Sequence, residues 1–140
     1  MPTKLLSEFL NGTYIGGENP IFTGTTTLEN TRFAITALGN RTGAVSIDLS
    51  AADVYTLTAI GNITFSFANS PTSVYAGQVT VTVVQDATGG RTITWPASAK
   101  FDGGTSPPAT TTANAKDVWT VWTYDGGTTH HVSLAQKDVK

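Results

Sequence analysis

The chain has 140 residues, a formal net charge of −2, 13% charged residues and no cysteine. This length predicts one domain that can bury a core of its own. The missing cysteines exclude disulfides, thiolate metal sites and thiol nucleophiles, and the weak charge argues against a nucleic-acid interface or a basic membrane-binding patch. Threonine makes up about a fifth of the chain. Because this β-branched residue suits a half-exposed pleated surface, the composition predicts an all-β fold.

Residues 1–30 differ from the rest and are predicted to form an N-terminal arm. Apolar residues near its start have the spacing of one or two turns of amphipathic helix, which would need a surface to pack on. Three hypotheses are open: the arm caps the β domain, it docks on a neighbouring subunit, or it is disordered. No signal peptide and no membrane-spanning segment is expected. The candidate interface residues of the arm are Leu5, Leu6, Phe9, Leu10, Tyr14, Ile21 and Phe22.

From residue 31 onward, short runs of alternating apolar and polar residues predict β-strands separated by Gly, Asn and Asp turns. One of these turns, Gly61-Asn62, is a two-residue hairpin signal. About eight or nine short antiparallel strands are expected. This pattern is typical of a β-sandwich, here of jelly-roll type, that spans residues 31–140. The predicted strands include 31–38, 44–49, 54–60, 63–67, 79–83, 91–95, 117–124 and 128–134.

The clearest strand–turn–strand signal is the ribbon 77–96. Valines alternate with threonines at 79–83, a polar turn follows at 85–90, and the chain returns at 91–95. Pro96 ends the returning strand because proline has no N–H for a ladder. The two strands are predicted to pair with each other and to place their valines and tryptophan in the core.

A second hairpin is predicted at 117–134. Alternation places Trp119 on one face and Trp122 with Tyr124 on the other, so we expect a core against one face and a loop or partner against the other. The stretch 97–115 before this hairpin is the longest irregular segment. A loop of that length in a small domain is usually functional or an interface element.

No constellation of residues predicts catalysis. The carboxylates lie mostly in turns, where aspartate supports the backbone, and no two have a spacing that forces an acid–base pair. His130 and His131 are adjacent on a predicted strand, so they point to opposite faces and cannot easily share a metal ion. One is expected at the surface and one against a neighbour. We therefore expect a protein that is not an enzyme and has no cofactor or metal.

Aromatic residues are the remaining candidates for ligand contacts. Exposed rings can stack on sugars, but all three tryptophans lie in predicted strands, which favours core packing. Tyr14 and Tyr75 lie beside glycine-containing or polar segments and are better candidates for exposed contacts.

Several of these segments together resemble a β-rich module of tailed-bacteriophage virion proteins. The resemblance implies a structural role in the virion, but similar modules occur both at the ends of tail fibres and in head-surface proteins. It covers about residues 43 to 136. The segments that carry it are Gly61–Phe67, Gln85–Lys100, Gly103–Thr105, Thr111–Asn114 and Thr123–Thr128.

The short chain favours one of these two locations. With 140 residues and no shaft, it is most similar in size to a capsid decoration, or cement, protein. That resemblance implies a homotrimer bound to the major capsid protein on the outer capsid surface, made in the host cytoplasm, without nucleic-acid or membrane partners. The alternative is a tail-fibre or baseplate module that recognises host-surface glycans. This alternative predicts an exposed aromatic cleft near residues 97–115.

Overall fold

The computed structural model describes residues 32–140, so the predicted arm and its candidate interface residues, from Leu5 to Phe22, lie outside the described residues. In the described part, regular structure is β except for one 3-10 turn, η1 (Asp102–Gly104). No helix there is long and apolar enough to cross a membrane. The strands are β1 (Ile35–Asp48), β2 (Val54–Ala68), β3 (Gly77–Gln85), β4 (Ile93–Thr94), β5 (Ala99–Lys100), β6 (Lys116–Thr123) and β7 (His130–Val139).

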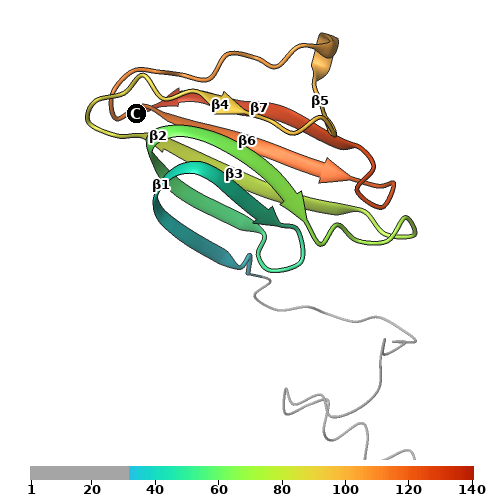
Figure 1. The fold of residues 1–140 in the computed structure, drawn as a ribbon. Helices are drawn as coiled ribbons and strands as arrows, with labels where there is room; N and C mark the ends of the chain where they lie inside the picture. The colour runs from blue at the N-terminus through green and yellow to red at the C-terminus, as the bar shows by residue number, and fades with distance from the viewer. Residues whose placement is uncertain (1–31) are drawn as a thin grey trace, which may run out of the picture. The chain divides into compact units, whose positions relative to one another are not determined.

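Hydrogen bonds join these strands into one curled sheet in the order β1–β2–β3–β6–β7–β5, with β4 paired to β2 (Figure 1). The pairs β1–β2, β2–β3, β2–β4 and β5–β7 are parallel, while β3–β6 and β6–β7 are antiparallel. The all-β prediction is confirmed. The prediction of eight or nine antiparallel strands is wrong, because residues 32–140 contain seven strands and most of their pairings are parallel. The jelly-roll sandwich is not confirmed.

β1 and β2 are long because each bends back where a turn between two strands was predicted. In β1 the bend lies between Gly39 and Gly43, which have φ of 70° and 71°, a backbone conformation that glycine adopts without steric cost. The parallel pairing of β1 with β2 continues across the bend: Val45 lies beside Phe65, and the last pair is Asp48 with Ala68. Gly61-Asn62 is therefore no hairpin turn: its two flanks belong to one strand, whose partners are β1, β3 and β4.

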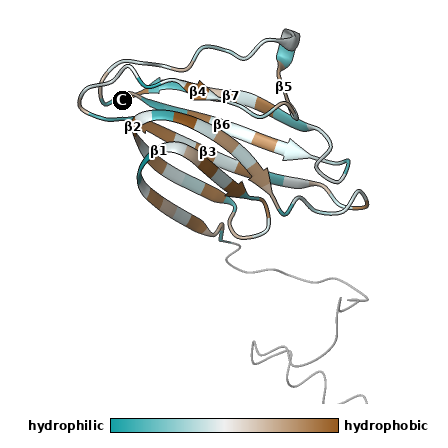
Figure 2. Ribbon diagram, in the orientation of Figure 1, coloured by the Kyte–Doolittle hydropathy of each residue, from teal (hydrophilic) through white to brown (hydrophobic). Residues whose placement is uncertain are grey.

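The bends wrap the sheet around one hydrophobic core. Trp95, directly after β4, packs on Phe65 of β2 at a ring-centroid distance of 4.8 Å and on Trp119 of β6 at 5.1 Å. Figure 2 shows the alternation of hydrophobic and polar residues along the strands that this arrangement requires. The buried core residues include Val45, Ile47, Tyr55, Leu57, Ala59, Ile63, Phe65, Val79, Val81, Val83, Trp119, Val121 and Val132.

The ribbon 77–96 folds differently from its prediction. The valines of β3 are buried and Trp95 packs against the core, as expected. However, β3 pairs with β2 and β6, and β4 pairs with β2, so the two strands of the ribbon are not partners of each other. The connection between β3 and β4 instead carries the chain across the core from one half of the curled sheet to the other, as the bends do in β1 and β2.

Hydrogen bonds close the end of the sheet at which β3 ends. The buried Gln85 side chain donates from Nε2 to the carbonyl oxygens of Arg91 and Thr110, both at 2.9 Å, and accepts the Arg91 N–H at Oε1, also at 2.9 Å. Asp117 of β6, also buried, accepts the Thr110 N–H at 2.6 Å. We call these contacts the Gln85 clamp. They tie the irregular stretch 97–115 to the sheet.

Candidate functional site

The β6–β7 hairpin was predicted, and its two faces have different surroundings. Trp119 points into the core and is 0% exposed, whereas Trp122 is 41% exposed and Tyr124, just past the end of β6, is 53% exposed. The predicted alternation is confirmed. The expectation that all three tryptophans pack in the core is wrong for Trp122. The outer face of the hairpin therefore presents aromatic surface to solvent.

Three rings on this outer face contact one another. Trp122 stacks on His131 of β7 with a centroid distance of 4.7 Å, and Tyr124 lies nearly parallel to His131 at 5.5 Å, with 12° between the ring planes. Trp122 and Tyr124 are 5.2 Å apart. We call Trp122, Tyr124 and His131 the ring cluster. Because each ring supports the other two on a hydrogen-bonded hairpin, the cluster forms a pre-organised surface.

Strand register extends this cluster into a row of side chains across the sheet. Gln78 of β3 lies beside Trp122, Trp122 lies beside His131, and His131 lies beside Lys100 of β5. Residues directly opposite each other on neighbouring strands point to the same face, at a strand spacing of about 4.8 Å. The row thus combines an amide, the ring cluster and an ammonium group. The Lys100 Nζ also donates to the Ala97 carbonyl oxygen at 3.1 Å.

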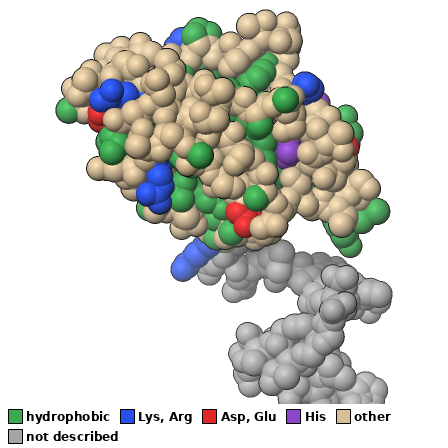
Figure 3. Space-filling model, in the orientation of Figure 1, with side chains coloured by type: hydrophobic (Ala, Val, Ile, Leu, Met, Phe, Trp, Pro, Cys, Tyr) green, Lys and Arg blue, Asp and Glu red, His purple; other side chains and the backbone are tan. Residues whose placement is uncertain are grey.

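Further exposed apolar side chains lie at the same end of the sheet. The β2–β3 connection packs closely against the β6–β7 turn. The closeness is seen at Gly127 of the turn, where an added Cβ would lie 2.5 Å from Ser70 Oγ of the connection. This connection also carries the exposed residues Val74 and Tyr75, and for Tyr75 exposure was predicted. Figure 3 shows hydrophobic side chains at the right-hand end, where these two connections lie, on a surface that is otherwise mostly neutral and polar.

His130 points away from the ring cluster, to the inner face of the sheet. It is buried, packs on Phe67 with the rings tilted and their centroids 4.3 Å apart, and forms hydrogen bonds with Ser70 Oγ at Nε2 (3.0 Å) and with Ser98 Oγ at Nδ1 (3.1 Å). Burial lowers its pKa, while the charge of Asp125 raises it by less. The prediction that the two histidines point to opposite faces is confirmed. His130 holds two connections in place below the ring cluster.

Carboxylates near the candidate site hold turns together. Asp125 Oδ1 accepts the Thr129 N–H at 2.9 Å, and this bond is the main cause of its lowered pKa. At the other end of the sheet, the hydrogen bond from Arg91 lowers the pKa of Asp86. Both carboxylates are therefore ionised at neutral pH and engaged by the backbone or a cation. In the part of the chain that the structure describes, no group of three or more His, Asp and Glu residues could hold a metal ion.

The ring cluster is the part of the site that the sequence did not single out. The aromatic surface lies on the β6–β7 hairpin rather than in a cleft of the 97–115 segment, which contributes only Lys100 to the row. Two aromatic residues at i and i+2 on a strand whose other face is already filled by Trp119 are the signal that could have found it. The residues proposed for the arm interface, from Leu5 to Phe22, lie outside the described residues.

Comparison with known families supports a phage virion protein. A family model described as "Putative phage tail fibre C-terminal domain" matches residues 37–129, about two-thirds of the chain. No curated protein and no solved structure matches the chain. The match gives the capsid-decoration prediction no support, because the family is described as a tail-fibre domain. The chain belongs to this phage tail fibre C-terminal domain family.

Proposed function

We propose that this domain is the receptor-binding part of a tail fibre and that its ring cluster contacts a glycan of the host surface. The observation that carries the proposal is the exposure of Trp122 and Tyr124 on a rigid hairpin. Trp and Tyr supply large apolar contact area at little cost in side-chain entropy, and they keep a polar group for hydrogen bonding. A sugar has the complementary surface, with C–H groups on its faces and hydroxyls at its rim.

The polar groups beside the rings suit the same ligand. Gln78 offers both a donor and an acceptor for sugar hydroxyls, and Lys100 offers donors at the opposite end of the row. Binding by such a row requires no bond to be made or broken, so we propose a binding protein rather than an enzyme.

Two predictions from the capsid hypothesis stay open. A homotrimer and contact with a major capsid protein were implied by the resemblance to capsid decoration proteins, and the arm that would suit such contacts lies outside the described residues. Immunogold labelling of intact virions would separate the locations: label on the tail tip supports the proposal, and label spread over the head contradicts it.

Glycan binding can be tested directly with an array of bacterial surface polysaccharides. We expect the wild-type chain to bind a subset of them and Trp122→Ala to lose at least tenfold in affinity, as is common when a central aromatic contact is removed. Ile60→Ala is the matched control, because Ile60 is another exposed large apolar residue, in β2 next to its bend. Equal losses in both variants, or no binding by the wild type, would contradict the proposal.

A further inference from the structure

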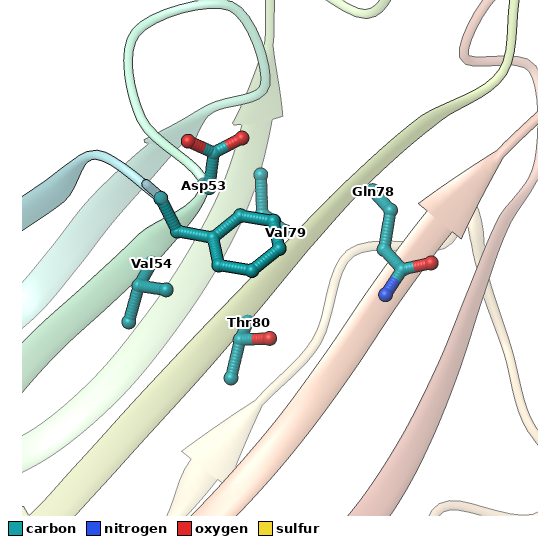
Figure 4. A pocket seen from close by; sticks show the side chains of 6 residues that line it. Asp53, Val54, Gln78, Val79 and Thr80 are labelled. Carbon is teal, nitrogen blue, oxygen red and sulfur yellow. The ribbon is translucent and has the colours of Figure 1, made fainter. Parts of the chain in front are cut away.

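A hollow of about 370 Å³ lies where β2 and β3 begin. Its lining combines one aromatic ring, three hydrogen-bonding side chains and the starts of both strands (Figure 4). The lining residues are Phe33, Asp53, Val54, Gln78, Val79 and Thr80. The hollow is therefore mixed in chemistry, with both apolar and hydrogen-bonding side chains in its lining.

Asp53 and Gln78, two of these hydrogen-bonding side chains, lie on opposite sides of the hollow. Figure 4 shows the Asp53 carboxylate on one side and the Gln78 amide on the other. Asp53 Oδ2 accepts the Ala34 N–H at 2.7 Å, which fixes the position of the carboxylate. Since a carboxylate has about four lone-pair sites, it retains acceptor capacity for the hydroxyls of a ligand.

Phe33 gives the hollow an apolar surface that residues 32–140 leave open. It is 71% exposed, although burial of a large apolar side chain is worth about 1.5–3 kcal/mol. An exposed ring beside a carboxylate and an amide is suited to a ligand that has an apolar face and a hydroxylated rim. That is the chemistry of a sugar ring, which the ring cluster also fits.

Gln78 connects the hollow to the ring cluster. It lines the hollow and lies directly beside Trp122 in the β3–β6 pairing. From the start of β2 to β7 the outer face crosses three strand spacings, roughly 14 Å in all. Among the described residues, the strands that hold the hollow and those that hold the rings are direct neighbours in the sheet, so one ligand chain could lie across both.

We propose that the Phe33 hollow is a second sugar subsite and that the outer face binds an extended oligosaccharide, with Gln78 contacting the chain between the two subsites. This inference rests on the proposed function, because it assumes that the ring cluster holds the first sugar. It differs from that function in requiring a ligand of several sugars, whereas the ring cluster alone would suffice for one terminal sugar.

The test uses the polysaccharide that binds most tightly on the array, cut into fragments of one to about six sugars. Affinities are measured by calorimetry for the full wild-type chain and for Phe33→Ala. We expect wild-type affinity to rise with fragment length and then level off. Phe33→Ala should weaken binding of the long fragments about tenfold and leave that of the shortest unchanged, whereas Trp122→Ala should weaken binding at every length.

Ile35→Ala is the matched control, because Ile35 is as exposed as Phe33 and close to it in sequence but does not line the hollow. Equal affinity for all fragment lengths, or identical behaviour of Phe33→Ala and Ile35→Ala, overturns the second subsite and leaves the proposed function intact. If the wild type binds no polysaccharide, both fail. Sedimentation of the same variants completes the test: an oligomer that only Phe33→Ala dissociates would make the hollow a subunit contact and overturn the inference.

Discussion

Two glutamines on one strand show how differently the two ends of the sheet are built. Gln78 and Gln85 lie near the start and at the end of β3, roughly 23 Å apart along an extended strand. Gln85 is buried and makes three hydrogen bonds that close its end of the sheet. Gln78 is exposed and lies between the Phe33 hollow and the ring cluster.

The difference explains why the most recognisable part of the sequence says little about binding. Gln85–Lys100 is the longest segment that carries the phage-module resemblance. The structure uses its residues for the clamp, for the Asp86–Arg91 ion pair at 2.7 Å and for the glycine turn. These residues specify a scaffold. The opposite end carries the exposed aromatic surface, and there Gln78, Trp122 and His131 lie outside the segments that carry the resemblance.

Among the substitutions that test this difference between the two ends, Gln85→Ala is expected to have the largest effect on stability. It leaves the carbonyls of Arg91 and Thr110 and the Arg91 N–H without their partner. Since each unsatisfied buried group costs about 1–3 kcal/mol, we expect a loss of about 3–4 kcal/mol in the free energy of unfolding, measured with urea. Gln78→Ala should change stability by less than about 0.5 kcal/mol, as exposed substitutions usually do.

Glycan affinity should respond in the opposite way in the same two variants. Gln78→Ala should weaken binding, while Gln85→Ala should retain the wild-type affinity per folded molecule. A stable Gln85→Ala variant, or a Gln78→Ala variant with unchanged affinity for long fragments, would show that the two ends are not specialised as described.

A smaller effect is expected at the adjacent glycines of the Gln85 end. Gly89 and Gly90 both have positive φ, 70° and 77°, so alanine is strained at either position, at about 1–2 kcal/mol. A Cβ on Gly89 would also lie 2.6 Å from the Thr111 carbonyl oxygen, whereas nothing lies within 4 Å of a Cβ on Gly90. Gly89→Ala should therefore cost about 2 kcal/mol more than Gly90→Ala, in line with overpacking.

This pair of variants separates steric fit from backbone strain, since the second effect is common to both. Thermal unfolding of each variant beside the wild type is sufficient. Equal destabilisation would mean that the contact with the 110–115 segment does not restrict the turn.

The sequence predicted the β6–β7 hairpin and the local alternation well, because both depend on residues close together in the chain. It mistook the bends at Gly39–Gly43 and Gly61-Asn62 for turns between antiparallel strands. Glycine in the sequence signals a change of direction, but whether the flanking segments pair with each other or with neighbouring strands depends on distant partners. The parallel pairing of β1 with β2 is such a long-range result.

The candidate site was predictable only in part. Opposite faces for Trp119 and Trp122 followed from the period of a strand. The sequence could not show that the outer face remains open, because nothing in the local pattern indicates whether another segment covers a strand. The row from Gln78 to Lys100 joins four strands, and the hollow adds Phe33 from before β1, so neither could be assembled without the register.

The smallest expected effect concerns pH and the end of the sheet that carries the ring cluster. Burial lowers the pKa of His130 below its ordinary value near 6.5, so the unfolded chain binds more protons than the folded one as the pH falls below about 6.5. The contribution of neutral His130 to stability should be complete above that pH and should decrease as the pH falls toward the folded-state pKa. Urea unfolding between pH 7 and pH 5 should therefore show decreasing stability.

His130→Gln removes the titrating group while keeping a side chain that can hydrogen-bond to Ser70 or Ser98, so it should reduce the slope of stability against pH in this window. His131→Gln is the matched control for loss of a histidine from the same strand, because it leaves His130 and its two serine contacts in place. The lowered pKa values of Asp86 and Asp125 place the titration of these two carboxylates below this window. If His130→Gln leaves the slope of stability against pH unchanged, other groups cause the loss of stability in acid. In that case the contacts of His130 with Ser70 and Ser98 do not make this end of the sheet sensitive to pH.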